Sequence, residues 1–287
     1  MSVFDPLTAT LLDLARALDP AKIPLTVGGG FGLYLKQEHL RQTGERTLLT
    51  ELPAPRATND IDLFLRVDVL VNLGAMQQVA SVLDALGFEA VESGRFFQWV
   101  RPLPDGHEVK LDLLVGPLGD FRSQLKTDKP PRVRPKGKLR LHAHTTEEAI
   151  EIDTRSANFT LAGNCTDGAP YSTQIYVPQA FTYLMMKLFA FDDRKQDQSR
   201  DVGRHHAMDL YRIVAIMTEA EYDETLSLSR KHADDSRVAR AREIVATDFG
   251  SQTDLGVLRY REHNLYRASL QTAEFMKTLS EVFSTSK

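Results

Sequence analysis

The pattern of apolar residues changes at Pro178, and this change limits the architectures open to the chain. Before Pro178, short runs with strand-like character alternate with turns and a few helical stretches. After it, apolar residues recur at helical spacing towards the C-terminus, with few strand-like runs. The sequence therefore predicts an α+β fold, in which a mixed sheet with flanking helices at 1–177 precedes a helical domain at 178–287.

Local patterns give a first set of elements. Helical spacing predicts helices at 5–18, from about 33, at 69–86, 179–192, 203–217, 219–231, 235–247 and 263–283. Strand patterns and turn residues predict strands at 23–27, 60–65, 94–101, 109–115, 139–144, 149–152, 158–162 and 173–177. The polar residues 41–57 are expected to form a loop.

Composition excludes several classes of protein. Hydrophobic residues make up 42% and charged residues 26% of the 287 positions, so the chain is expected to fold rather than remain disordered. A net charge of -4 gives the whole molecule no attraction for a polyanion, so a nucleic-acid contact must be local. No apolar stretch reaches the roughly 18 residues of a membrane span and no secretory signal is recognisable, so we expect a cytoplasmic protein. The single cysteine, Cys165, lies in a turn-like segment and is not expected to be a nucleophile.

Two aspartates share one face of a predicted strand. In Thr58-Asn-Asp-Ile-Asp-Leu-Phe-Leu65, alternation places Asp60 and Asp62 on one side, about 7 Å apart, and the aliphatic residues on the other. Their mutual repulsion is relieved by a bridging cation, and Mg²⁺ takes one or two carboxylates together with substrate phosphates. The alternative is a chance Asp-x-Asp at the start of a strand.

A third carboxylate lies within a second apolar strand pattern, Val109-Lys-Leu-Asp-Leu-Leu-Val115. If the two strands are neighbours, Asp112 completes a three-carboxylate site for two Mg²⁺ ions. Such a site activates an attacking hydroxyl and neutralises a leaving pyrophosphate. The alternative role of Asp112 is a salt bridge with a nearby Lys or Arg.

A glycine run separates a predicted strand from a predicted helix. Gly28-Gly-Gly30-Phe-Gly32 fits a phosphate-binding turn, because glycine lets backbone N–H groups approach an anion at a helix N-terminus. No Gly-Lys-Ser/Thr follows the run, and its spacing differs from Gly-x-Gly-x-x-Gly. The kinase-type and dehydrogenase hypotheses therefore lose their main support.

The order strand, glycine turn, helix, Asp60-x-Asp62 and a later strand carboxylate resembles the nucleotidyltransferase superfamily of DNA polymerase β type. Further along, Tyr183-Leu-Met-Met-Lys-Leu-Phe-Ala-Phe-Asp-Asp-Arg194 is followed by Arg200-Asp201 and His206-Ala-Met-Asp-Leu-Tyr211. These segments look like the helical signature of the AbiEii/MenT-type toxins within that superfamily. The resemblance covers about residues 23–217.

The resemblance implies transfer of a nucleotide from an NTP, with Mg²⁺, to a hydroxyl such as the 3′ end of tRNA. It makes Asp60, Asp62 and Asp112 metal ligands, Gly29 and Gly30 a phosphate-binding turn, and Asp209 the late catalytic acid. Lys187, with Arg194 two turns on, would contact the triphosphate. A toxin of this kind would have a cognate antitoxin as partner. The usual Gly-Ser of the family is Gly29-Gly30 or Gly30-Phe31 here, which removes a hydroxyl from the nucleotide site.

Other interpretations remain open. Lys187 could instead extend along an apolar helix surface. The acceptor could be a small molecule or a protein side chain, or the chain could be a catalytically silent member that binds RNA or protein. His142 with His144, and His205 with His206 near Asp209, suggest a zinc site, but their spacing does not favour one.

One segment is strongly basic. Between Lys126 and Arg140 there are seven Lys and Arg residues, one Asp and three prolines, so an extended, mobile segment is expected. It is either a solvated loop or a contact for the phosphate backbone of an RNA acceptor.

Overall fold

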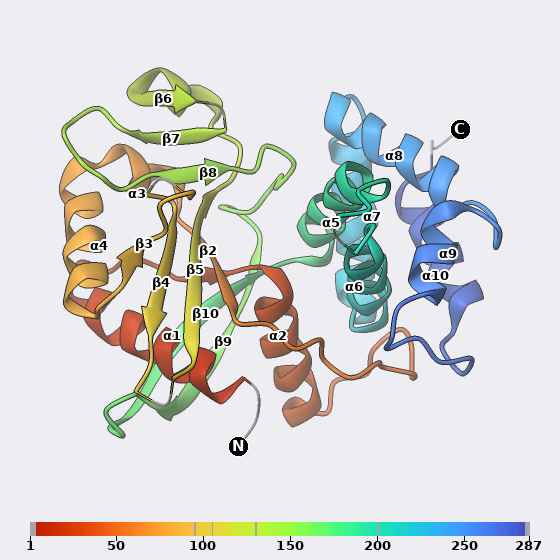
Figure 1. The fold of residues 1–287 in the computed structure, drawn as a ribbon. Helices are drawn as coiled ribbons and strands as arrows, with labels where there is room; N and C mark the ends of the chain where they lie inside the picture. Colours follow the sequence, from red (N-terminus) through yellow and green to blue (C-terminus); the bar gives the residue numbers. More distant parts are fainter. Residues whose placement is uncertain (1–3, 95, 105, 130, 200, 285–287) are drawn as a thin grey trace. The chain divides into compact units, whose positions relative to one another are not determined.

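The computed structural model describes residues 4–94, 96–104, 106–129, 131–199 and 201–284 (Figure 1). The chain forms two compact units, Met1–Leu35 with Ala57–Pro178, and Lys36–Arg56 with Gln179–Lys287. The first unit carries a mixed sheet with flanking helices, and the second is helical, as the sequence predicts. The change at Pro178 thus coincides with a division between units. The assignment of residues 36–56 to the second unit was not predicted.

One mixed sheet organises the first unit. Its main path runs β6-β7-β8-β5-β2-β1-β10-β9, while β4 pairs with β5 and β3 pairs with β4. The pairs β2/β5, β5/β8 and β1/β10 are parallel, and the other neighbours are antiparallel. The strands are β1 Thr26–Val27, β2 Asp60–Phe64, β3 Glu89–Ala90, β4 Gln98–Pro102, β5 Glu108–Val115, β6 Leu125–Lys129, β7 Arg132–Pro135, β8 Ala143–Thr145, β9 Ser156–Asn164 and β10 Pro170–Pro178.

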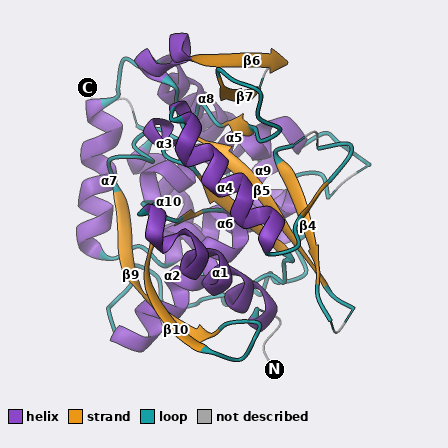
Figure 2. Cartoon of the chain, turned by 90° about the vertical axis from the view of Figure 1, so that its left-hand side faces the viewer, coloured by secondary structure: helices purple, strands orange, loops and turns teal. Residues whose placement is uncertain are grey.

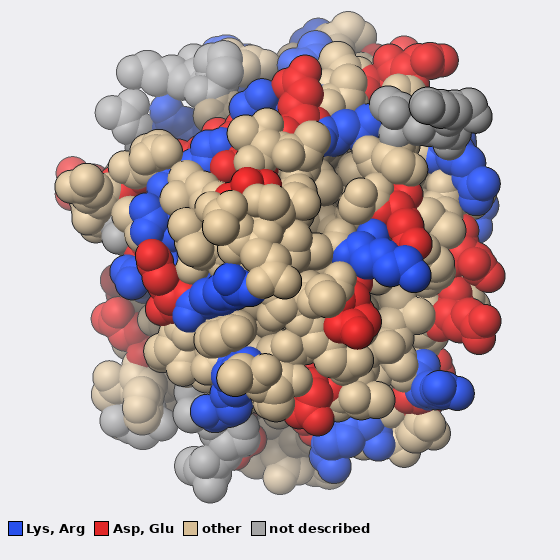
Figure 3. All heavy atoms as spheres, turned by 90° about the vertical axis from the view of Figure 1, so that its right-hand side faces the viewer, with Lys and Arg blue, Asp and Glu red and all other residues tan. Residues whose placement is uncertain are grey.

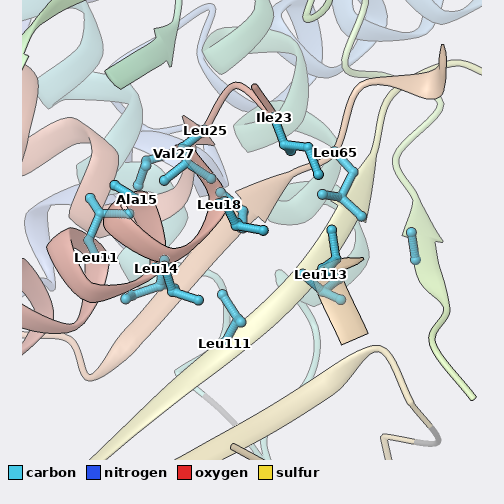
Figure 4. Packing of buried hydrophobic residues seen from close by; sticks show 14 of the residues in the cluster. Leu11, Leu14, Ala15, Leu18, Ile23, Leu25, Val27, Leu65, Leu111 and Leu113 are labelled. Atoms are coloured by element: carbon cyan, nitrogen blue, oxygen red, sulfur yellow. The ribbon is translucent and has the colours of Figure 1, made fainter. Parts of the chain in front are cut away.

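Helices pack on one face of this sheet and bury its aliphatic side (Figure 2). Leucines of α1 (Asp5–Leu18) join apolar residues of α4 (Leu73–Ala85) and of β2 and β5 in one buried cluster, part of which Figure 4 shows. The remaining helices of this unit are η1 Asp19–Ala21, α2 Gly29–Thr43, which continues into the second unit, α3 Val67–Val71 and η2 Gly119–Gln124. Burying a leucine contributes about 1.5–3 kcal/mol, so this cluster holds β2 and β5 firmly in place.

The second unit consists of helices around a core rich in aromatic rings. Tyr211 stacks on Tyr260 at 5.3 Å between ring centroids, and Phe275 packs against both. The helices are α5 Ala180–Arg194, α6 Arg204–Ala215, α7 Glu219–Lys231, α8 Ser236–Asp248, α9 Leu255–Arg261 and α10 Thr272–Val282. These helices follow one another as the spacing of apolar residues predicts, with two exceptions. Helix α9 was not predicted, and α10 is shorter than the predicted helix 263–283.

Three local predictions are wrong, each for a physical reason. The predicted helix 69–86 is two helices, because Asn72 leaves the helical conformation and its side chain accepts a hydrogen bond from the N–H of Ala75, capping α4. Residues 149–152 form turns instead of a strand, with Glu151 at φ 67°. Helix α2 begins at Gly29, so the glycine run opens the helix instead of forming a separate loop.

Two further features concern the hydropathy of the helices and the charge of one face. Within the described residues, no helix is long and apolar enough to cross a membrane. The face drawn in Figure 3 carries Lys/Arg and Asp/Glu side chains interspersed among other residues. Charges of both signs on one face partly cancel at a distance, so this face has no extended field of one sign.

Candidate functional site

The aspartates of β2 and β5 lie on neighbouring strands, as the sequence predicts. The two strands pair in parallel, with Asp62 opposite Asp112 and Asp60 opposite Lys110. Register partners point to the same face, so Asp60, Asp62 and Asp112 share one side of the sheet. The intervening Ile61 and Leu111 are fully buried on the side that α1 and α4 cover. The carboxylates therefore lie on the sheet face that this helix layer leaves open.

The environment of Asp112 favours its protonated form. Burial raises the pKa of its carboxyl group, and the negative charge of Asp60 raises it further. Gln98 Nε2 donates a hydrogen bond to Asp112 Oδ2 at 3.2 Å and, with the charge of Lys110, lowers this pKa in part. The net shift is upward. A nearby cation would lower this pKa again, because it stabilises the charged carboxylate.

The backbone of Gly29 lies directly against the side chain of Asp62. Gly29 has φ 61°, a left-handed conformation, and a Cβ added to it would lie 1.7 Å from Asp62 Oδ2. The N–H of Gly28 donates to the backbone carbonyl of Asp62 at 2.8 Å. Glycine at position 29 is thus required both by the backbone and by the adjacent carboxylate.

This contact changes the interpretation of the glycine run. Gly29 and Gly30 form the first turn of α2, and the acidic group that lies against Gly29 is the side chain of Asp62. A helix N-terminus attracts negative charge, and the side chain of Asp62 lies at the N-terminus of α2. Phosphate binding at Gly29 and Gly30 stays a prediction, and a bound phosphate would share this N-terminus with Asp62.

The donor set suits one kind of metal. Within the residues that the structure describes, no group of three or more Asp, Glu, His or Cys side chains is arranged to hold a metal ion. A closed protein cage is therefore not formed. Mg²⁺ commonly takes one or two carboxylates and completes its shell with water and substrate phosphates. Asp62 and Asp112, side by side on adjacent strands, fit such a shared ion. The metal role of Asp60, Asp62 and Asp112 stays a prediction.

Lys187 and Asp209 form a buried ion pair in the second unit. Lys187 Nζ on α5 donates to Asp209 Oδ2 on α6 at 2.7 Å, and the Asp209 side chain is 1% exposed. Arg212 Nη1 lies 3.3 Å from Asp209 Oδ1. Burial alone would raise the pKa of Asp209, but the charges of Lys187, Arg212 and Arg56 outweigh it and lower this pKa well below its usual range. Asp209 is therefore ionised at neutral pH.

Arg194, predicted with Lys187 as a triphosphate contact, also lies on α5. Its Nη1 is 3.0 Å from His206 Nε2. Burial, followed by the charge of Lys187, lowers the pKa of His206 to about 3, so this imidazole is neutral and accepts a hydrogen bond from Arg194. Arg200, another residue of the helical signature, lies outside the described residues.

Arg56 was not predicted from the sequence. Its charge lowers the pKa values of Asp209, His205 and His263, which places it in the same electrostatic cluster as the ion pair. Arg56 follows Pro53 and Pro55 in the segment 36–56, and no local pattern distinguishes it from an ordinary loop arginine. Lys187, Arg212 and Arg56 together leave an excess of positive charge around Asp209.

The histidines considered for a zinc site have other partners. His205 Nδ1 lies 2.9 Å from His263 Nε2, a contact that the sequence did not predict. Burial and the charge of His205 lower the pKa of His263 to about 4, which keeps it neutral. His142 and His144 instead contact the rings of Phe96 and Phe97. Among the described residues, these histidines belong to no group of three or more possible metal ligands, so the structure adds no support for zinc.

Cys165 occupies the turn that the sequence predicts. It is buried in the connection between β9 and β10, where its N–H donates to the carbonyl of Ala169. Burial raises the pKa of its thiol, which disfavours the thiolate.

No protein-family model matches the chain, and no curated protein matches its sequence.

Proposed function

We propose that the chain is an Mg²⁺-dependent nucleotidyltransferase that moves a nucleotide from an NTP to an acceptor hydroxyl. The observation that carries the proposal is the placement of Asp62 beside Asp112 on adjacent parallel strands, with Asp60 on the same face. Three acidic groups on one open sheet face, close enough for Asp60 to raise the pKa of Asp112, form an environment that favours a divalent cation.

The chain's residues then have distinct roles. Asp60, Asp62 and Asp112 hold Mg²⁺, which supplies charge neutralisation at the phosphates and a more acidic acceptor hydroxyl. The acceptor oxygen would form a bond to the α-phosphorus as the bond to the departing pyrophosphate breaks, and the hydroxyl proton would pass to water. Gly29 keeps space for the Asp62 carboxylate, and the first turn of α2 at Gly29 and Gly30 offers N–H groups to a phosphate.

The second unit carries Lys187 and Arg194, the two residues that the motif resemblance assigns to the triphosphate. Lys187, Arg212 and Arg56 surround the single carboxylate of Asp209, and this excess of cations supports a role in anion binding. In this proposal, Asp209 holds Lys187 in position, and Lys187 and Arg194 contact the nucleotide.

The acceptor follows from the motif resemblance. We propose the 3′ end of an RNA such as tRNA, in a toxin that acts in the cytoplasm and is restrained by an antitoxin protein. A small molecule or a protein side chain remains the alternative acceptor.

A second candidate function has specific support. The Asp62 carboxylate lies against the N-terminal turn of α2, and no ready metal-binding group is formed by the described residues. Both observations favour a catalytically silent member that binds RNA or protein without binding NTP.

One experiment separates the two candidates. The purified chain is incubated with each labelled NTP and total cellular RNA, with Mg²⁺ or with EDTA. The proposal predicts Mg²⁺-dependent label in RNA and release of pyrophosphate. Absence of pyrophosphate release with every NTP, when the RNA still binds, would favour the silent member. Pyrophosphate release without label in RNA would point to another acceptor.

A further inference from the structure

The strand register connects the carboxylates to the basic segment. Leu114, two residues beyond Asp112 on β5, is the partner of His144 on β8, and His144 is the partner of Arg132 on β7. Register partners and residues two apart along a strand point to the same face. Arg132 therefore lies on the sheet face of Asp112, two strands away, which is roughly 10 Å across the sheet.

The basic segment is a β-hairpin at the edge of the sheet. The segment that was expected to be extended forms β6 and β7, an antiparallel pair that β8 joins to the rest of the sheet. Lys126 is opposite Arg134, and Arg134 is two residues from Arg132, so these three cations share the face of the carboxylates. Val133 and Pro135 are buried on the opposite side. The hairpin thus presents positive charge in a fixed arrangement. We call Lys126, Arg132 and Arg134 the cationic row.

This arrangement is electrostatically costly by itself. Like charges directly opposite each other on neighbouring strands are destabilising, as for Lys126 and Arg134. Arg134 Nη1 donates a hydrogen bond to the carbonyl of Gly137 at 2.6 Å, which orients the guanidinium. Among the described side chains, no acidic residue forms an ion pair with Arg132, Lys136, Lys138 or Arg140. A negatively charged partner would compensate the charges of these last four residues.

An aromatic ring lies against His144 of β8, the strand between β5 and β7. The half-buried ring of Phe97 lies 5.3 Å from the ring of His144, between centroids. Phe97 directly precedes Gln98, the residue that donates to Asp112. Nearby, the Arg140 guanidinium lies 6.0 Å from the centroid of the Phe96 ring. Cations interleaved with accessible aromatic rings are typical of surfaces that bind single-stranded nucleic acid, where bases stack on rings and phosphates meet cations.

We infer that the cationic row binds the backbone of a single-stranded RNA, which runs past Phe97 with its end directed towards Asp62 and Asp112. The inference rests on the proposed function for the direction of the strand, but binding itself requires no catalysis. An acidic peptide or an anionic membrane would use the positive charge but would give Phe97 and His144 no bases to stack on. The combination therefore favours RNA.

Binding can be measured without NTP. A fluorescein-labelled single-stranded oligoribonucleotide is titrated with the full chain over a series of salt concentrations. For Lys126→Gln/Arg132→Gln, the loss of two phosphate contacts is expected to weaken binding and to reduce the slope of log K against log salt by about 1.4. The variant leaves the hydrogen bonds of Arg134 intact. Lys126→Arg/Arg132→Lys keeps the charges and should bind as the wild type does.

Two comparisons make the result decisive. Arg46→Gln/Lys277→Gln removes the same charge from exposed positions of the second unit and should leave the slope unchanged. Phe97→Ala should weaken RNA binding at every salt concentration without changing the slope. Equal affinity and slope for Lys126→Gln/Arg132→Gln and the wild type would overturn the inference. The inference would also be overturned if Arg46→Gln/Lys277→Gln lost as much RNA affinity and slope as Lys126→Gln/Arg132→Gln. Binding to phosphatidylserine vesicles or oligoglutamate in place of RNA would overturn it as well. If RNA binds as expected but NTP transfer is absent, the proposed function fails while the docking surface stands.

Discussion

A Cβ on Gly29 would lie 1.7 Å from Oδ2 of Asp62, so these two residues fit together only because position 29 has no side chain. The contact joins the first turn of α2 to strand β2 and orients one of the three carboxylates. A substitution at Gly29 therefore tests whether the position of Asp62 matters to function.

Gly29→Ala should lower both stability and activity. The left-handed backbone at φ 61° and the overlap with Asp62 are together expected to cost about 1–3 kcal/mol in the free energy of unfolding. Gly44→Ala is the matched control, because Gly44 has φ 70° but no atom within 4 Å of an added Cβ. Denaturant unfolding and NTP transfer are measured for both. Equal losses of transfer in the two variants would show that strain alone, and not Asp62, is responsible.

The sequence predicted the parts of the first unit that bear on the site. Alternation in β2 and β5 correctly placed Ile61 and Leu111 in the core and Asp62 and Asp112 on the other face. Local sequence patterns could not predict the register between β2 and β5, because the pairing of these strands depends on where the intervening α3, α4 and β4 pack. The φ of Glu151 likewise follows from tertiary context and not from a residue type that favours turns.

Removal of Asp209 should destabilise the second unit strongly. In Asp209→Ala, Lys187 and Arg212 would remain buried without their shared carboxylate, at an expected cost of about 3–5 kcal/mol. Lys187→Met should cost less, because Arg212 still partners Asp209. The free energy of unfolding from denaturant titration tests this order. A larger loss for Lys187→Met than for Asp209→Ala would contradict the charge arrangement described here.

The same variants separate packing from nucleotide binding. If Lys187 contacts the triphosphate, Lys187→Met should weaken NTP binding at temperatures where the variant is fully folded. Equal NTP affinity in folded Lys187→Met and wild type would leave Lys187 with a structural role alone.

Stability should fall in mild acid. Folding lowers the pKa of His206 to about 3 and that of His263 to about 4, from the ordinary 6.5. The unfolded chain therefore binds more protons than the folded chain between pH 4 and 6.5, and stability is lost as pH decreases through this window. Each histidine contributes up to about 1.4 kcal/mol per pH unit.

Histidine variants test the source of this effect. His206→Gln/His263→Gln should flatten the decrease in unfolding free energy between pH 6.5 and 4, whereas His107→Gln, at an exposed position, should not. An unchanged pH profile for His206→Gln/His263→Gln would assign the acid sensitivity to other groups.

The sequence did not predict how charged groups and rings cluster around Asp209. Lys187 and Asp209 were singled out by the motif resemblance, but their direct ion pair was not predicted. Arg56 and His263 come from segments remote from α5 and α6 in the chain, and neither belongs to a recognisable motif. Tertiary packing within the second unit brings their charges and rings together with His205 and Asp209.

We propose that the carboxylates of β2 and β5 perform metal-dependent nucleotide transfer. The most direct test is the rate of pyrophosphate release from labelled NTP, with Mg²⁺, for wild type, Asp60→Ala, Asp62→Ala and Asp112→Asn. The account predicts that each variant loses transfer, while its unfolding free energy without metal stays level or rises slightly because carboxylate repulsion is relieved. Transfer at the wild-type rate in Asp62→Ala or Asp112→Asn would contradict the claim.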